Sequence, residues 1–428
     1  MHLHYTSGRR HPMAVALLAV LASLSARQQA NAAPPPQLAI SSSWEVFHDS
    51  DQSLCGSTKM HIDSPMRAFK DQYGLVHMTT ADPEGRAWQW KGTVAQFTGN
   101  PHNATRDCTP VMNGYSGNNQ IDRFDQKTFL QGFYFDPETA YVYGYGHEDY
   151  FGTRLDDPDC HKGGTSDGKP VCWYSAVAIW KADALNTTPA GHLDFVKYNG
   201  VPWHIAIYPH VVYPGDANTP LAGWIGYGTP SNLVRKHSAD GSPDGYTYMF
   251  AYTSSGYGAQ AKGVCLFRSD DPLVRSSWRA WDGNTSTPGF TQAMNNPYIS
   301  ATAPCAVVNP GEFSTYLRSV HWHAPSQHYI AIYSVGDSLV EGDGRISVRY
   351  ATSQDLIHWN ASQELLVSTS DGVSYPAVLD YDSASSPGIG DYNFDTIYDQ
   401  GRTYLYYRTR IVAGHTQIKR RLLEVSNY

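Results

Sequence analysis

The sequence has little charge, and the charge that it has is mainly negative. Charged residues make up 16 % of the 428 residues, and the formal net charge is −8. A nucleic-acid partner requires a basic face that neutralises phosphates, so this composition argues against nucleic-acid binding. Windows with helical periodicity that are rich in Ala, Leu, Glu and Lys are also scarce, whereas short β-branched or aromatic runs are common. The sequence therefore predicts an all-β protein.

Long apolar runs are missing after the first 32 residues, where no segment approaches the ~18 residues that span a bilayer. At the start of the chain, Arg9 and Arg10 precede the apolar stretch 13–24, and Ala30-Asn31-Ala32 fits a cleavage site. We therefore expect a signal peptide over 1–32, a linker over 33–40 and one domain over 41–428. The mature protein is expected to be secreted or periplasmic, monomeric and without a membrane partner.

Cysteine is sparse, and no Cys-x-x-Cys or His-x-x-x-His spacing indicates zinc, so no metal site is predicted. Six cysteines in an exported chain predict three disulfides. The best-supported pair brackets a Gly/Asp/Lys loop, and the other two join nearest remaining neighbours: Cys160–Cys172, Cys55–Cys108 and Cys265–Cys305. The nucleophile elbow, the P-loop and the dinucleotide fingerprint are also missing, which leaves serine-hydrolase and nucleotide chemistry without support.

A strand–turn–strand unit recurs along the chain. Its first copy is a strand predicted over 60–71 that presents Asp63 and Arg67, followed by the turn Asp71-Gln72-Tyr73-Gly74. Further copies begin near residues 128, 222, 315 and 376. Five units at roughly 70–90 residues predict a five-bladed β-propeller with four-stranded blades, because radial packing buries the faces that one blade leaves exposed. A stack of β-sandwiches is the alternative, but no linkers divide the chain.

The strand expected over 44–47 has no neighbour nearby in the sequence. In a propeller it would complete the last blade and join the two ends of the chain, which protects the sheet edges.

Glycosidic cleavage needs two carboxyl groups, one of them protonated at the working pH. Asp63 and Glu148 are the leading candidates, with a strand-end cap and a solvated loop end as their structural alternatives. Glu148 follows an aromatic strand, and Tyr145, Tyr150 and Asp149 are placed to raise its pKa. His147 is an alternative proton donor. In the fifth unit, Asp380 or Asp382 is the candidate for a third carboxylate.

Other polar side chains are candidates for binding the substrate. Asn232 suits sugar hydroxyls, and Arg235 suits a carboxylate, unless either caps a turn. His321 and His323 share one face of their strand because they alternate, and this pair is interpreted as polar lining rather than as a metal site. The full set of predicted binding residues is Arg67, His147, Tyr150, Asn232, Arg235, Arg318, His321 and His323.

The segment Ala351-Thr352-Ser353-Gln354-Asp355-Leu356-Ile357-His358-Trp359-Asn360 is similar to the recurring Ser-x-Asp-Leu-x-x-Trp element of the five-bladed propeller glycoside hydrolases, the arabinanase, xylosidase, invertase and levansucrase group. In this element Asp355 is expected to cap a turn and Trp359 to pack between sheets. Asp63 resembles the first-blade Asp of that group, which acts as base or nucleophile, although Ser64 here separates it from Pro65. The segment 230–235 also resembles an uncharacterised exported bacterial family.

The resemblance implies an exported carbohydrate-active enzyme that hydrolyses glycosidic bonds in an oligo- or polysaccharide. It implies no cofactor, with a structural calcium ion in the central channel as the one option. Two alternatives stay open. One is a polysaccharide lyase with a His or Tyr base and an Arg that neutralises a uronate, and the other is a non-catalytic propeller that binds glycans.

Overall fold

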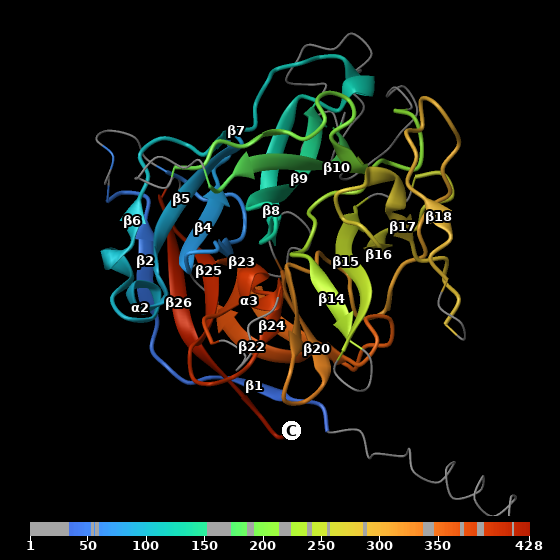
Figure 1. The fold of residues 1–428 in the computed structure, drawn as a ribbon. Helices are drawn as coiled ribbons and strands as arrows, with labels where there is room; N and C mark the ends of the chain where they lie inside the picture. The colour runs from blue at the N-terminus through green and yellow to red at the C-terminus, as the bar shows by residue number, and fades with distance from the viewer. Residues whose placement is uncertain are drawn as a thin grey trace, which may run out of the picture.

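The computed structural model describes residues 34–52, 55, 60–151, 173–185, 192–213, 224–237, 242–254, 257–285, 289–336, 346–368, 372–382, 389–412 and 415–428. Five sheets stand around a common centre (Figure 1), which confirms the predicted five-bladed β-propeller. The expected signal peptide and the Cys160–Cys172 pair lie outside the described residues. Within the described residues, no helix has the length and apolar character needed to cross a membrane.

The first two blades have the strand orders β3-β4-β5-β6 and β11-β10-β9-β8, with β7 paired to β5 and both β12 and β13 paired to β10. Their bounds are β3 (Arg67–Lys70), β4 (Leu75–Ala81), β5 (Arg86–Thr93), β6 (Thr105–Arg106), β7 (Met112–Asn113), β8 (Lys127–Asp136), β9 (Tyr141–Phe151), β10 (Trp173–Asp183), β11 (Val196–Lys197), β12 (Ile205–Ile207) and β13 (Ile225–Gly226).

The third and fourth blades have the orders β14-β15-β16-β17-β18 and β22-β21-β20-β19-β24. Their bounds are β14 (Val234–His237), β15 (Pro243–Thr253), β16 (Gly263–Ser269), β17 (Arg279–Ala280), β18 (Gln292–Ala293), β19 (Ser319–His323), β20 (His328–Val335), β21 (Ile346–Ser353), β22 (Gln363–Ser368) and β24 (Thr396–Ile397). Short helices lie in connections: α2 (Val94–Thr98), α3 (Ile389–Asn393), η1 (Pro101–Asn103), η2 (Ile121–Arg123) and η4 (Arg275–Ser277).

The fifth blade joins the two ends of the chain. It contains β1 (Gln37–Ile40), β2 (Glu45–Asp49), β23 (Val373–Asp380), β25 (Thr403–Val412) and β26 (His415–Ser426). Both N-terminal strands pair antiparallel with β26, and Figure 1 shows the blue β2 beside the red β26. The predicted closing strand is thus confirmed, and β1 adds a second closing strand that the sequence analysis did not anticipate.

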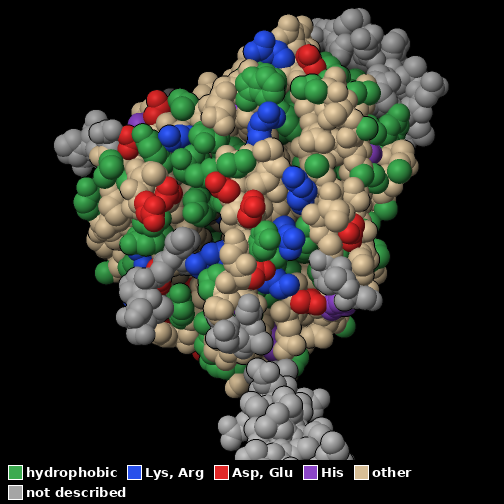
Figure 2. Space-filling view, turned by 45° about the vertical axis from the view of Figure 1, so that its right-hand side comes forward, with side chains coloured by type: hydrophobic (Ala, Val, Ile, Leu, Met, Phe, Trp, Pro, Cys, Tyr) green, Lys and Arg blue, Asp and Glu red, His purple; other side chains and the backbone are tan. Residues whose placement is uncertain are grey.

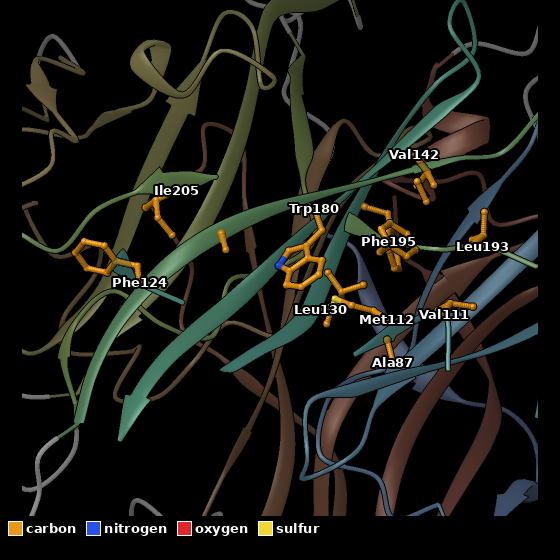
Figure 3. Packing of buried hydrophobic residues seen from close by; sticks show 14 of the residues in the cluster. Ala87, Val111, Met112, Phe124, Leu130, Val142, Trp180, Leu193, Phe195 and Ile205 are labelled. Carbon is orange, nitrogen blue, oxygen red and sulfur yellow. The ribbon is translucent and has the colours of Figure 1, made fainter. Parts of the chain in front are cut away.

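Hydrophobic cores fill the spaces between neighbouring blades. Figure 3 shows one of them, where Ala87 and Met112 of the first blade meet Leu130 and Trp180 of the second. Side chains alternate along a strand, so one strand contributes to the hydrophobic cores on both faces of its blade. In β23, Ala377 and Leu379 pack toward the first blade, whereas Val378 packs toward the fourth.

The segment before the first blade differs from the prediction. Residues 60–66 are not a strand, and β3 begins only at Arg67. Pro65 has no N–H to contribute to a ladder, and the hydroxyl of Ser64 accepts the backbone N–H of Ala81 at 2.7 Å. The backbone N–H of Asp63 also bonds Ala81, at 2.8 Å, so this loop crosses the end of the blade and carries Asp63 there.

Other local predictions are confirmed. The turn after β3 closes with a 3.0 Å bond from Gly74 N–H to the Asp71 carbonyl, and Gly74 has φ +80°. Asp355 accepts the N–H groups of Ile357 and His358, and Trp359 packs on neighbouring aromatic rings. The structure also contains two of the predicted disulfides, Cys55–Cys108 and Cys265–Cys305. On the face seen in Figure 2, basic and acidic side chains are interspersed rather than gathered.

Candidate active site

A cavity of about 160 Å³ lies where the five blades meet. Each blade or the segment that leads into it contributes to the lining. Asp63 precedes β3, His147 lies in β9, Thr229 precedes β14, Arg318 precedes β19, and Tyr375 lies in β23. Side chains far apart in the sequence therefore face one space, as a propeller allows at its axis.

Asp63 and Tyr375 form the first polar contact of this cavity. The Tyr375 hydroxyl donates a 2.9 Å hydrogen bond to the carboxylate of Asp63, and the guanidinium of Arg408 lies 3.5 Å from the same oxygen. The side chain of Asp63 is 34 % exposed. Burial of the carboxyl raises its pKa, and the charge of Arg408 together with the Tyr375 hydrogen bond opposes this rise.

Tyr375 reaches the cavity because β23 is irregular there. The register between β23 and β25 shifts between Ser374 and Ala377, and Tyr375 has φ +53°. A bulky side chain rarely adopts this left-handed backbone, and such bulges re-aim side chains near active sites. The bulge thus supplies the hydroxyl that contacts Asp63.

His147 and Asp149 form the second polar contact. They alternate along β9, so both point toward the cavity. Nε2 of His147 lies 2.7 Å from Oδ1 of Asp149, and the same oxygen accepts hydrogen bonds from Trp173 Nε1 at 2.6 Å and from Ser175 at 2.7 Å. Both side chains are buried. Gly228 leaves room for the imidazole, because a Cβ at that position would collide with the His147 ring.

Glu148 lies on the opposite face of β9. Its carboxyl accepts the N–H groups of Gln126 and Lys127 at 2.8 and 3.0 Å and contacts the hydroxyl of Thr128. Burial raises its pKa to about 8, although these hydrogen bonds oppose the rise. The carboxyl group therefore ties the start of β8 to β9 rather than facing the cavity. Tyr150 shares this side of β9 and is buried in the core between the first two blades.

Aromatic rings form one wall of the cavity. The ring centroids of Trp173 and Trp224 are 4.8 Å apart, and Trp224 stacks on Tyr316 at 5.7 Å with an interplanar angle of 11°. The apolar face of a sugar ring packs well on such a surface, because both are flat and weakly hydrated. Trp173 lies in β10 and Trp224 directly precedes β13, both in the second blade, whereas Tyr316 precedes β19 of the fourth.

Three lining residues carry buried polar atoms that have no hydrogen-bond partner among the described residues. They are Nε and Nη1 of Arg318, Oε1 of Gln131 and Oγ1 of Thr229. Each residue is at most 7 % exposed. Beneath them, Arg67 donates to the backbone carbonyls of Gln131 and Arg318, which positions the two residues. Unpartnered buried polar groups are rare in folded proteins and require an explanation.

The remaining predicted binding residues lie outside this cavity. Arg67, Asn232 and His321 line a separate cavity of about 10 Å³. The side-chain amide of Asn232 pairs with the backbone of Val320, and His321 bonds the hydroxyl of Ser319 at 2.6 Å and the carbonyl of Phe394 at 3.0 Å.

Three more predicted residues have structural partners. Arg235 forms two bonds of 2.7 and 2.9 Å to Asp395. His323 bonds Ser326 at 2.7 Å, on a strand end away from the cavity. Asp380 accepts the N–H groups of Asp382 at 3.0 Å and Tyr398 at 2.5 Å, and burial raises its pKa to about 6. None of these three lines the cavity that contains Asp63.

The residues at the axis do not fit the calcium ion that the resemblance allows. Arg67 is buried there, and its guanidinium donates to the carbonyl oxygens of Met66, Gln131 and Arg318, which are the kind of ligand calcium would need. Within the described part of the chain, no group of three or more His, Cys, Asp or Glu side chains is placed to hold a metal ion.

Several cavity residues were not singled out as site residues from the sequence. Asp149 was considered only as a neighbour that could tune Glu148, and its role follows from alternation once β9 is known to extend to Phe151. The sequence analysis did not name Trp173 or Trp224. Tyr375 is followed by Pro376, which signals an irregular strand because it cannot donate to the ladder, but this signal does not show that the Tyr375 side chain faces the cavity.

No protein-family model and no curated protein sequence matches this chain. Among solved structures, it is similar to a protein of unknown function from Dyadobacter fermentans (9 % identity, 92 % of this chain and 100 % of that chain, TM-score 0.45). It is also similar to an α-L-arabinofuranosidase from Lactobacillus brevis (10 % identity, 83 % of this chain and 90 % of that chain, TM-score 0.41). A third similar structure is that of an N-acetylgalactosamine deacetylase from F. plautii (9 % identity, 91 % of this chain and 95 % of that chain, TM-score 0.44). At these levels the likeness is one of architecture.

Proposed function

We propose that this protein is an exported glycoside hydrolase that removes a terminal sugar in the cavity lined by Asp63, His147 and Asp149. The observation that supports this most directly is that a carboxylate from one blade and a His–Asp pair from the next face one cavity with an aromatic wall. The volume of about 160 Å³ is below the roughly 300–1,000 Å³ of pockets for drug-sized ligands, which suits one sugar unit.

In this proposal Asp63 is the general base. It takes a proton from the water that attacks the anomeric carbon, and a raised pKa makes its carboxylate a stronger base. His147 is the general acid, which gives its proton to the oxygen of the leaving sugar as the glycosidic bond breaks. Asp149 holds Nε2 of His147 and stabilises the imidazolium. Return of the proton from Asp63 to His147 through solvent restores both groups.

The proposal uses Asp149 and His147 where the sequence analysis favoured Glu148. The reason is placement, since Glu148 points to the other face of β9 and its oxygens are occupied by backbone N–H groups and Thr128. The two disulfides are consistent with an extracellular location, where such bonds persist. We therefore propose that the protein acts on a sugar substrate outside the cell.

The test is a screen of nitrophenyl glycosides and plant and bacterial oligosaccharides with the wild type and Asp63→Asn. Asparagine keeps an oxygen for the Tyr375 hydroxyl but cannot act as a base, so turnover should fall about 100-fold or more. Asp136→Asn is the matched control, because Asp136 caps the turn after β8 by accepting the N–H of Glu138 and the hydroxyl of Thr139, outside the cavity. Equal turnover of Asp63→Asn and the wild type would overturn the proposal.

A lyase reaction in the same cavity is the second candidate. The ring of Tyr375 lies 4.7 Å from the guanidinium of Arg318 and 4.7 Å from that of Arg408, and its hydroxyl contacts Asp63. A phenol in such surroundings could remove the C5 proton of a uronate with loss of the 4-O-linked sugar. The product would then contain a carbon–carbon double bond that absorbs in the ultraviolet, whereas hydrolysis adds water and gives none.

A further inference from the structure

Arg318 is the feature of the cavity that the proposed chemistry leaves unexplained. Its guanidinium lies 4.2 Å from the ring centroid of Tyr316 and 4.7 Å from that of Tyr375, and Nε and Nη1 have no hydrogen-bond partner among the described residues. The residue is 3 % exposed. A buried cation without a hydrogen-bonded anion is costly, so the protein retains it only where something compensates.

The cavity offers Arg318 no carboxylate of its own at ion-pair distance within the described residues. Asp149 is already bonded to His147, Trp173 and Ser175. Asp63 accepts from Tyr375 and lies 3.5 Å from Arg408. The charges of Arg408, Lys127 and Arg318 all act on Asp63, so this side of the cavity is positive around a single carboxylate.

The neighbouring unpartnered groups are neutral, and they include hydrogen-bond donors as well as acceptors. Oε1 of Gln131 accepts hydrogen bonds, and the hydroxyl of Thr229 donates and accepts them. Sugar hydroxyls satisfy such groups, whereas the planar fork of a guanidinium matches a carboxylate with two parallel hydrogen bonds. One ligand that carries hydroxyl groups and a carboxylate would satisfy all three residues.

We infer that the sugar bound in this cavity is a uronic acid, whose carboxylate pairs with the guanidinium of Arg318 while Gln131 and Thr229 bond its hydroxyl groups. This inference rests on the proposed function in that the cavity takes a terminal sugar, and it names the chemical class of that sugar. Arg67 acts as a positioning residue, since it holds the backbone carbonyls of Arg318 and Gln131 from below.

Calorimetric titration of the mature protein with galacturonate, glucuronate, galactose and glucose tests the inference. We expect at least one uronate to bind about tenfold or more tightly than its neutral counterpart, since charge-assisted bidentate pairs are strong. Arg318→Met should bring the acidic and neutral sugars to within about twofold, and Arg318→Lys should keep part of the preference because the charge remains. Added salt should weaken uronate binding more in the wild type than in Arg318→Met, where the charges of Arg408 and Lys127 remain.

The control is Arg349→Met, which removes an arginine of the same blade whose guanidinium bonds Ser362 outside the cavity. It should leave the preference intact, and thermal melts check that each variant folds. Should Arg318→Met fail to fold, Arg318→Lys still tests whether uronate binding needs the planar fork of the guanidinium. Equal binding of acidic and neutral sugars by the wild type overturns the inference, as does a preference that survives Arg318→Met. Tighter binding of galactose 6-sulfate than of galacturonate also overturns it.

A separate product assay distinguishes this inference from the proposed hydrolysis. Oligosaccharides with a terminal uronate and their neutral counterparts are incubated with the enzyme, and the released sugar is quantified by chromatography. Tight uronate binding without cleavage would support the inference and reject the hydrolase. Cleavage of neutral chains with no preference for uronates would reject the inference and leave the hydrolase standing.

Discussion

The hydroxyl of Tyr375, in the fifth blade, donates a 2.9 Å hydrogen bond to the carboxylate of Asp63, which lies 312 residues earlier at the entrance to the first blade. The two residues meet because β26 pairs with the N-terminal strands and closes the ring. Ring closure thus brings together the proposed base and the side chain that we expect to orient it.

Replacing Tyr375 with Phe should lower turnover about tenfold or more without unfolding the protein, because it removes the hydrogen bond that orients the carboxylate of Asp63. The hydrogen bond favours the charged form of Asp63. Its loss should therefore raise the pKa of Asp63 and move the acidic limb of the pH–rate profile to higher pH. Tyr404→Phe is the control, because that hydroxyl bonds the Thr98 carbonyl outside the cavity. An unchanged profile for Tyr375→Phe would show that this contact plays no part in turnover.

The general architecture was accessible from the sequence because it depends on local signals that repeat. The turn residues Asp71 and Gly74 and the capped segment around Asp355 have the same physical chemistry in any surroundings. Spacing then gave the number of blades, and the strand 44–47 without a local partner gave the closure. These features need no knowledge of which side chain faces which cavity.

The site was harder to predict from the sequence. It depends on which residues of a strand face the cavity and on an irregular stretch of backbone. Glu148 was expected to follow an aromatic strand, but β9 includes it and continues to Phe151. Side chains alternate along a strand, so this continuation sends His147 and Asp149 to the cavity and Glu148 to the other face. The bulge that turns Tyr375 into the cavity is marked only by Pro376, which cannot donate to the ladder, and a proline does not tell which way the neighbouring side chain points.

Glu148→Gln should keep activity and change how stability depends on pH. Burial raises the pKa of Glu148 from 4.5 in the unfolded chain to about 8 in the folded one. Between these values the folded state holds a proton that the unfolded state has released, so the contribution of this group to stability falls as pH rises. Glutamine mimics the protonated form and removes this loss, so the variant should gain on the wild type by about 1 kcal/mol or more from pH 5 to pH 8.

Urea denaturation across this pH range measures the effect, with Glu138→Gln, an exposed glutamate of a turn, as the control. If Glu148→Gln instead abolished turnover while the melting temperature stayed unchanged, Glu148 would be catalytic as the sequence analysis supposed.

Breaking the pair between Arg235 and Asp395 should destabilise the fold rather than the chemistry. Burial acts to raise the pKa of Asp395, but the guanidinium of Arg235 outweighs it and holds the pKa below its usual value. This stabilisation is present above the unfolded pKa of 3.8 and is lost as pH falls through the folded pKa. Asp395→Asn should therefore cost about 3 kcal/mol at pH 7 and less at pH 3, below the unfolded pKa.

The double variant Arg235→Met with Asp395→Asn should recover part of that loss, because it leaves no buried charge unpaired. Chemical denaturation of the two single variants and the double variant at both pH values completes the cycle. Strict additivity of the two losses would show that the pair is not coupled.

Asn232 provides the sharpest separation between a structural and a sugar-binding role. Its Oδ1 accepts the N–H of Val320 at 2.8 Å and its Nδ2 donates to the carbonyl of Val320 at 2.7 Å, so the side chain joins the segment that leads into the third blade to the fourth blade. Asn232→Asp turns the donor into an acceptor opposite that carbonyl, which should cost about 2–3 kcal/mol. Asn100→Asp is the matched control, since Asn100 only accepts the N–H of His102 and Asp caps equally well. A lowered melting temperature with unchanged KM would show that Asn232 holds neighbouring blades together. A raised KM at an unchanged melting temperature would show that it binds the sugar.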